Sequence, residues 1–93
     1  MRQYELTVIY PLEEDQFQPG RELLLADLAA NGAEVVKAGD PADRDLAYNI
    51  NKRARGRYVL YNLNIDPAKL VAIDKAFKLN QNILKYLFVK VEE

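Results

Sequence analysis

The sequence predicts an α+β fold in which two helices cover one face of a four-stranded antiparallel sheet. Two observations support this: apolar and polar residues alternate over several stretches of strand length, and apolar residues recur at helical spacing in two others. The stretches follow one another in the order strand, helix, strand, strand, helix, strand. A chain of 93 residues can form one hydrophobic core, so we expect a single domain over residues 1–93.

The strands are expected where apolar and polar residues alternate. Residues 1–10 and 57–65 show this pattern, and residues 83–91 form the last strand. The second strand is interrupted, because residues 33–38 are followed by the strand-breaking sequence Gly-Asp-Pro before residues 46–51 resume extended structure. One of the four expected strands is therefore irregular.

The helices are recognised by their ends. The first follows the acidic residues 13–15, which suit the positive end of a helix dipole, and Pro19 is its expected first residue. It stops at the Asn-Gly pair of residues 31–32. The second helix starts at the Asp-Pro pair of residues 66–67 and ends at residues 80–82. Right-handed crossovers then place both helices on one face of the sheet, in the βαββαβ topology called ferredoxin-like.

The residue types that are absent exclude many kinds of active site. The chain has no Cys and no His, which excludes disulfides, thiol nucleophiles and the usual zinc sites. Because Ser is absent too, Ser–His catalysis is excluded. There is no apolar run near the ~20 residues of a membrane-spanning helix and no signal-peptide start. We therefore expect a cytoplasmic protein with no membrane contact, and much of enzyme chemistry is excluded.

Charge is distributed unevenly, although the net charge is only −1. Residues 1–43 contain 3 basic and 9 acidic side chains, whereas residues 44–93 contain 10 basic and 5 acidic ones. The basic stretch 52–57 is expected to form the hairpin turn, in which Gly56 would supply backbone freedom. Basic residues of the first and last strands would extend it into one basic edge that could meet RNA phosphates. The candidate RNA-binding residues are Arg2, Lys52, Arg53, Arg55, Arg57, Lys85 and Lys90.

The sheet face opposite the helices is expected to be open and partly apolar. If residues such as Tyr61 point toward the helices, residues of the opposite parity gather on the other face. Its apolar members are Ile9, Tyr58, Leu60, Leu87 and Val89. Such a patch usually marks a partner site, and Tyr58 could also stack on an unpaired base. Alternatively, the loop at residues 39–45 or the C-terminal tail folds over the patch.

Four segments together resemble a known family. They are Met-Arg-Gln-Tyr-Glu at residues 1–5, Leu-Ala-Tyr-Asn-Ile-Asn-Lys at 46–52, Gly-Arg-Tyr-Val-Leu-Tyr at 56–61 and Asn-Ile-Leu-Lys-Tyr-Leu-Phe-Val-Lys at 82–90. Their order, their spacing and the chain length are similar to those of bacterial small-subunit ribosomal protein six, from Arg2 to about Val91. No single motif is decisive, but the combination is fairly specific.

The resemblance implies a structural constituent of the small ribosomal subunit, which is not an enzyme and has no cofactor or small-molecule substrate. Such a protein binds the central domain of small-subunit rRNA, as a heterodimer with small-subunit ribosomal protein eighteen. Arg2, Lys85 and Lys90 match family positions near RNA, whereas Tyr4, Tyr48, Tyr58 and Leu60 match positions around the partner-facing side. With the apolar residues of the open face added, the candidate partner-binding residues are Tyr4, Tyr48, Tyr58, Leu60, Leu87 and Val89.

Two departures and two alternatives accompany this resemblance. Asn49 replaces a family proline, and many members carry a longer tail than the one after Val91. An enzyme of the acylphosphatase type shares the topology but needs an anion-binding loop after the first strand. In this sequence residues 11–15, which follow that strand, are acidic and would repel a phosphate. A ligand-binding regulatory homodimer that pairs through the open face is the other alternative.

Overall fold

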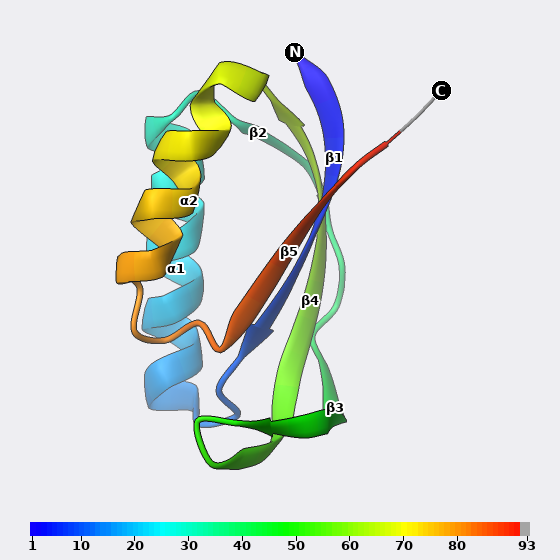
Figure 1. Cartoon of the computed structure of the whole chain (residues 1–93), viewed down its shortest axis with the longest axis vertical. Coiled ribbons are helices and arrows are strands. Elements are labelled where there is room, and N and C mark those ends of the chain that lie inside the picture. The colour runs from blue at the N-terminus through cyan, green and yellow to red at the C-terminus, as the bar shows by residue number, and fades with distance from the viewer. Residues whose placement is uncertain (92–93) are drawn as a thin grey trace.

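The computed structural model describes residues 1–91. It has two layers, an antiparallel sheet and two helices packed against one face of that sheet (Figure 1). The strands are β1 (Arg2–Tyr10), β2 (Glu34–Ala38), β3 (Ala42–Ile50), β4 (Arg53–Ile65) and β5 (Lys85–Lys90). The helices are α1 (Glu14–Ala30) and α2 (Leu70–Leu79), the latter preceded by the 3₁₀ turn η1 (Pro67–Lys69). The tail residues 92–93, on which one of the family departures falls, lie outside the described residues.

The strand order is β2-β4-β1-β5, and β3 also pairs with β4. This confirms the predicted fold, with one difference: the interrupted second strand is counted as two strands. Gly39 donates its N–H to the carbonyl of Leu60 at 2.7 Å and so still follows β4. Pro41 has no N–H to offer a sheet partner, and the ladder restarts after it with Ala42 opposite Tyr58.

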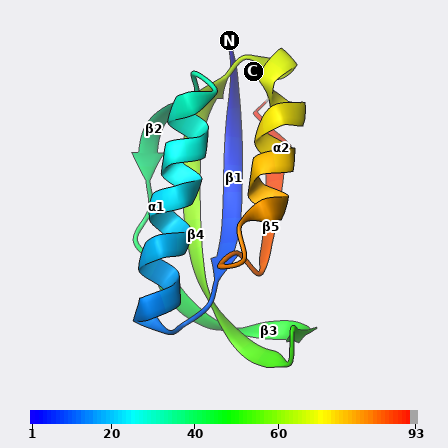
Figure 2. The same ribbon diagram turned by 90° about the vertical axis from the view of Figure 1, so that its left-hand side faces the viewer.

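The core lies between the helices and one face of the sheet (Figure 2). In the register, Val8 of β1 is opposite Val59 of β4 and Tyr86 of β5, so these three residues point to the same face. Every second residue in the middle of these three strands therefore faces the core. Buried residues from the sheet include Leu6, Val8, Tyr10, Val59, Tyr61 and Leu63, and those from the helices include Phe17, Leu24, Leu28, Ile73 and Phe77.

The expected helix ends are confirmed except for the first. Gly32 follows α1 with a φ of 73°, and Asp66 accepts a hydrogen bond from the N–H of Ala68 at 3.0 Å as an N-cap. However, α1 already begins at Glu14, so the prediction that Pro19 is its first residue is wrong. The carbonyl of Glu13 starts the helix by accepting the N–H of Phe17 at 2.8 Å. Pro19 is exposed within the helix, where the carbonyl that lacks its N–H partner can bond water.

The β3–β4 turn lies earlier than expected. Ile50 pairs with Arg53, and the two residues between them, Asn51 and Lys52, have φ values of 50° and 64°. Two positive φ values in a two-residue loop are typical of a type I′ hairpin turn. Gly56 is not in the turn but inside β4, where a Cβ would lie 2.5 Å from Cγ2 of Ile9. This glycine therefore allows a close approach of side chains above the strand.

The β3–β4 hairpin bends across the end of the sheet (Figures 1 and 2). Pairing between its strands is interrupted between Asp45 and Ile50. In the interrupted part, Tyr48 reaches the opposite edge of the sheet, where its hydroxyl accepts a hydrogen bond from Nζ of Lys85 at 2.8 Å. The hairpin tip and the start of β5 therefore lie at the same end of the molecule.

We expect Lys52→Gly to stabilise the protein. A left-handed backbone costs about 1 kcal/mol for a residue with a Cβ and almost nothing for glycine, so the free energy of unfolding should rise by about that amount. Urea denaturation measures it. The matched control is Lys75→Gly within α2, which should lower the free energy of unfolding by about 1 kcal/mol. If both variants lowered the free energy of unfolding by the same amount, the turn at Lys52 would not be strained.

Candidate interface on the open sheet face

The face of the sheet that the helices leave open is organised in rows across β4, β1 and β5. One row is Asn62–Glu5–Val89, the next is Leu60–Thr7–Leu87, and the last, beside the hairpin, is Tyr58–Ile9–Lys85. The apolar members of these rows are those that strand parity predicted. The hairpin end of the face is thus bounded by an aromatic ring and a lysine, and apolar side chains fill the middle.

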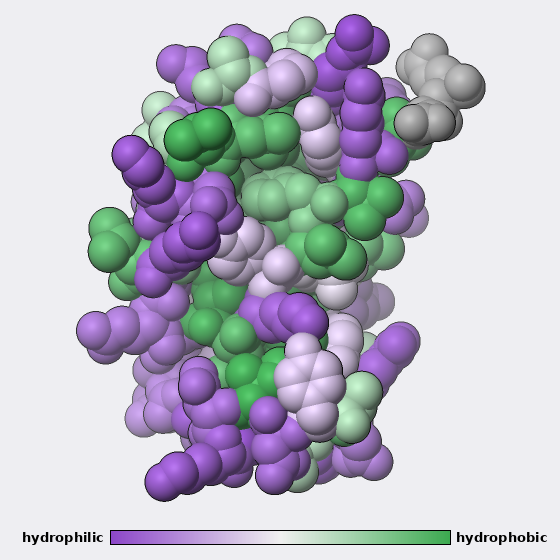
Figure 3. Space-filling model, viewed as in Figure 1, coloured by the Kyte–Doolittle hydropathy of each residue, from purple (hydrophilic) through white to green (hydrophobic). Residues whose placement is uncertain are grey.

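Three apolar side chains on this face are open to solvent. Leu60 is 45% exposed, Leu87 58% and Val89 49%. Seen from the β5 edge, apolar surface gathers over β5 and is flanked by hydrophilic side chains (Figure 3). Burying a fully exposed side chain of this kind is worth about 1.5–3 kcal/mol. Because these three are about half exposed, a contact that buries them gains roughly half of that for each, and this face is suited to a protein contact.

The chain covers only the hairpin end of this face itself. Ile9 is 8% exposed, and it lies against Gly56, beside Leu46 of β3. Within residues 1–91, the segment 39–45 that was expected to fold over the patch reaches Tyr58, through Arg44, and Ile9 is covered by Leu46 instead. Leu60, Leu87 and Val89 remain uncovered by residues 1–91.

Tyr4, which was expected on the partner-facing side, lies in the core instead. It has the parity of Leu6 and Val8, is 7% exposed, and meets the Phe88 ring edge to face at 6.5 Å. Tyr4 was assigned to the partner-facing side from the family resemblance alone, and that assignment conflicts with the parity of the strand. By contrast, Tyr48 is 60% exposed on the bent hairpin and Tyr58 is half-buried on the open face.

An arginine that the sequence analysis missed joins the open face. Arg44 of β3 places its guanidinium 5.6 Å from the centre of the Tyr58 ring. The two side chains border a shallow depression of about 230 Å³, which Thr7, Leu60 and Asp40 also line. Arg44 was assigned to a loop because extended structure was expected to resume only at Leu46; its alternation with Asp43 and Asp45 was the available signal.

The arginines at the start of β4 are held by acidic residues of the same chain. Arg53 pairs with Glu13 at 2.6 Å and Arg55 pairs with Asp45 at 3.1 Å. These pairs are partly exposed, so each contributes little to stability. They also occupy the positive charges that were expected to meet RNA.

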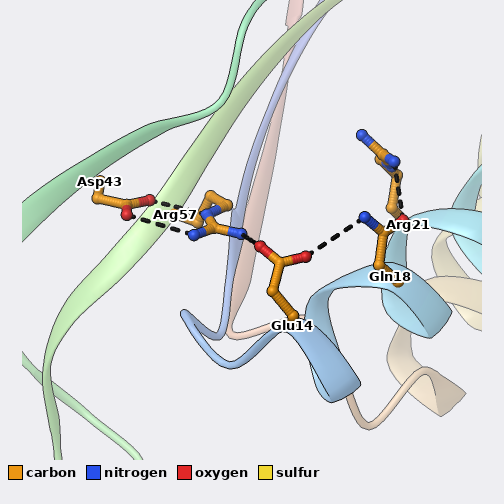
Figure 4. Close-up of polar contacts among 5 residues, drawn as sticks. All are labelled: Glu14, Gln18, Arg21, Asp43 and Arg57. Atoms are coloured by element: carbon orange, nitrogen blue, oxygen red, sulfur yellow. Dashed lines mark hydrogen bonds and ion pairs between the residues drawn. The ribbon is translucent and has the colours of Figure 1, made fainter.

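Arg57 is bound more extensively and joins three elements (Figure 4). Its guanidinium contacts Asp43 of β3 at 2.8 Å and Glu14 of α1 at 2.5 Å, and lies 4.6 Å from the centre of the Phe17 ring. The side chain is only 16% exposed. Hydrogen bonds from Arg57 lower the pKa values of Asp43 and Glu14, and those carboxylates raise the pKa of Arg57. This cluster ties the hairpin to the first turn of α1.

The other predicted RNA-binding residues form two groups and not one edge. Lys90 is opposite Tyr4 and Arg2 is opposite Ile65, which places both near the chain termini. Lys85 starts β5 at the hairpin end and Lys90 ends it. At 3.3–3.4 Å per residue, the Cα atoms of these two lysines are about 17 Å apart. The exposed residue Lys52 is in the turn of the hairpin whose Tyr48 contacts Lys85, so both lysines belong to that end of the sheet. Hydrogen bonding to Tyr48 raises the pKa of Lys85, which keeps it charged.

Within residues 1–91, no helix is long and apolar enough to cross a membrane. The same residues contain no cluster of three or more acidic side chains placed to hold a metal ion. The class of protein that the fold and this face define is a small α+β domain with one sheet face open to a macromolecular partner.

Comparison with known proteins identifies the family. Residues 3–90 match the family model of ribosomal protein S6. Small ribosomal subunit protein bS6 of Treponema denticola is 47% identical over 93 residues, which is the full length of both chains. The protein of the same name from Treponema pallidum is 35% identical over 92 residues, or 99% of each chain. The chain therefore belongs to the ribosomal protein S6 family.

A solved structure supports the fold independently. The crystal structure of 30S ribosomal protein S6 from Thermotoga maritima superposes with a TM-score of 0.85, covering 97% of this chain and 87% of that one, at 18% identity. The resemblance found from the sequence is thus confirmed. Family membership makes the chain a structural component of the bacterial small ribosomal subunit, located in the cytoplasm, and not an enzyme.

We expect Arg57→Met to reduce stability at neutral pH more than in acid. Because Arg57 lowers the pKa values of Glu14 and Asp43 in the folded state, their ion pairs stabilise the protein above the unfolded carboxyl pKa of about 4. That stabilisation is lost as the pH falls through the lower folded values. Urea midpoints at pH 7 and pH 2.5 test this, and the gap between wild type and variant should narrow in acid.

The control for this experiment is Arg55→Met. Its ion pair with Asp45 is largely exposed, with side-chain exposures of 53% and 87%, so the urea midpoint should change little at either pH. A gap for Arg57→Met that is as wide at pH 2.5 as at pH 7 would show that packing on Phe17, and not the ion pairs, is what the variant loses.

Proposed function

We propose that this chain binds the central domain of small-subunit rRNA as a heterodimer with small-subunit ribosomal protein eighteen, and that residues 1–93 act as one domain in doing so. The family resemblance suggests both partners. The observation that carries the proposal is the exposure of Leu60, Leu87 and Val89, in the part of the open sheet face that residues 1–91 leave in contact with solvent.

The protein partner is assigned to this open face. Burying three exposed aliphatic side chains favours a protein surface with apolar groups of its own. Tyr58 and Tyr48 border the same area at the hairpin end, and tyrosines are enriched at interfaces because an apolar ring carries a polar tip. The partner-binding residues proposed are therefore Tyr48, Tyr58, Leu60, Leu87 and Val89.

The RNA is assigned to cations at the two ends of the sheet. Arg2, Lys52 and Lys90 are exposed and make no ion pair with residues 1–91, while Lys85 contacts only the Tyr48 hydroxyl and ring among these residues. Lysine and arginine side chains of this kind neutralise phosphates without reading base sequence. Arg53, Arg55 and Arg57 would first have to leave their carboxylates, which makes them secondary contacts in this proposal.

We expect Leu60→Asp to abolish formation of the heterodimer. The change places a carboxylate in the centre of the apolar patch, where a partner would have to desolvate it without compensation. Gel filtration of the chain mixed with purified protein eighteen measures the complex. The matched control is Val71→Asp, which alters a 69% exposed apolar residue on α2 and should bind normally. If the wild type formed a homodimer and did not bind protein eighteen, the result would instead support the alternative of a regulatory homodimer.

We expect the affinity of the heterodimer for a central-domain rRNA fragment to fall with salt. If Arg2, Lys52, Lys85 and Lys90 each meet a phosphate, this chain contributes about −3 to −4 to the slope of log K against log salt, at roughly 0.7–0.9 per contact. Lys85→Gln should therefore reduce the slope by about 0.7–0.9, and Lys75→Gln on α2 should leave it unchanged. An unchanged slope for Lys85→Gln would remove Lys85 from the RNA contact.

A further inference from the structure

Glu5 is an exposed carboxylate set among the apolar residues of the open face. It projects from the central strand β1 and is opposite Val89 on one side and Asn62 on the other. The next row contains Leu60 and Leu87, both exposed. A surface that covers the apolar patch must therefore cover Glu5 as well.

No residue among 1–91 neutralises this carboxylate. The ion pairs within residues 1–91 lie at the hairpin, at the start of α1 and on α2, and none of these includes Glu5. Lys37 is in the same row on β2, but Asn62 of β4 lies between them. With strands about 4.8 Å apart, the two backbones are separated by roughly 10 Å. Lys85 lies two rows away and contacts Tyr48.

This isolation restricts what can dock on the face. Removing a carboxylate from water costs several kcal/mol unless the covering surface supplies a cation with hydrogen bonds to it. A nucleic acid that lay flat across the sheet would bring phosphates toward Glu5 and be repelled. A protein without a basic side chain at this point would leave the charge buried and unpaired, which disfavours the wrong partner.

We infer that Glu5 selects a basic protein for the open face by pairing with an Arg or Lys of that protein, and that it keeps RNA off the middle of the sheet. This inference rests on the proposed function, and it adds the charge that makes the contact specific. Asn62 supports the pair, because its side-chain amide oxygen can accept a further N–H from a guanidinium held by Glu5. The apolar neighbours Leu60, Leu87 and Val89 exclude water around it, which strengthens the attraction.

The test is the affinity of Glu5→Lys and Glu5→Gln for purified small-subunit ribosomal protein eighteen, measured by calorimetry. Loss of a buried charge-pair partner typically weakens a complex by 2–5 kcal/mol. We therefore expect a loss on the order of 100-fold for Glu5→Lys, and a smaller loss, about 10-fold, for the neutral isostere. The matched control is Glu22→Lys on the exposed side of α1, which makes the same change of charge away from the sheet and should alter the affinity by less than about twofold. Because Glu5 is exposed, thermal unfolding should be almost unchanged in all three variants.

The outcomes separate the inference from the proposed function. If the wild type binds protein eighteen and Glu5→Lys binds equally well, the inference is overturned and the proposed heterodimer stands. If the wild type does not bind protein eighteen at all, the proposed function is overturned, and the inference that rests on it is overturned as well. If Glu5→Lys tightens binding of the isolated chain to a central-domain rRNA fragment more than Glu22→Lys does, the sheet face takes RNA, and the inference is overturned for that reason.

Discussion

The alternation of residues along β1, β4 and β5 is the constraint on which this structure depends. Each strand is apolar on both faces over part of its length, yet the two crossovers place both helices on the same side of the sheet. Leu6, Val8 and Tyr61 are buried by that arrangement, whereas Leu60 and Leu87 are left in water. A one-residue shift of register would exchange these sets. The core and the candidate interface therefore come from the same register, and a shift of that register would change both together.

The bent hairpin divides the open face into parts with different chemistry. Arg57 holds β3 through Asp43 and holds α1 through Glu14, so the bend is tied to the helical layer. On the far side of the hairpin, Tyr48 reaches Lys85 across the end of the sheet. Cations and tyrosine rings consequently gather at this end, while apolar side chains and Glu5 occupy the middle rows. The ion pairs of β4 thus shape the surface although their own charges are neutralised.

Much of the fold could be predicted from local patterns, and the errors occur where a contact between distant residues decides. Alternation and capping residues are local, which is why the strands, the Asp66 cap and the end of α1 at Gly32 were found. Gly56 was assigned to the turn because nothing near it in sequence reveals Ile9 above its Cα. Arg57 was assigned to RNA because its carboxylates are 14 and 43 residues away. Tyr4 could have been placed from parity alone, and the resemblance was given too much weight there.

The net charge of −1 has a physical meaning once these contacts are known. The arginines at 53, 55 and 57 are balanced by carboxylates of the same chain. Of the seven candidate RNA-binding residues, Arg2, Lys52, Lys85 and Lys90 then remain for phosphates, in two groups at opposite ends of the sheet. Neither group is large enough to hold RNA tightly by itself. A basic protein on the open face would lie between them, with its own cations joining both groups into one positive surface. On this reasoning the carboxylate of Glu5 serves RNA binding indirectly, because it favours the kind of partner that completes that surface.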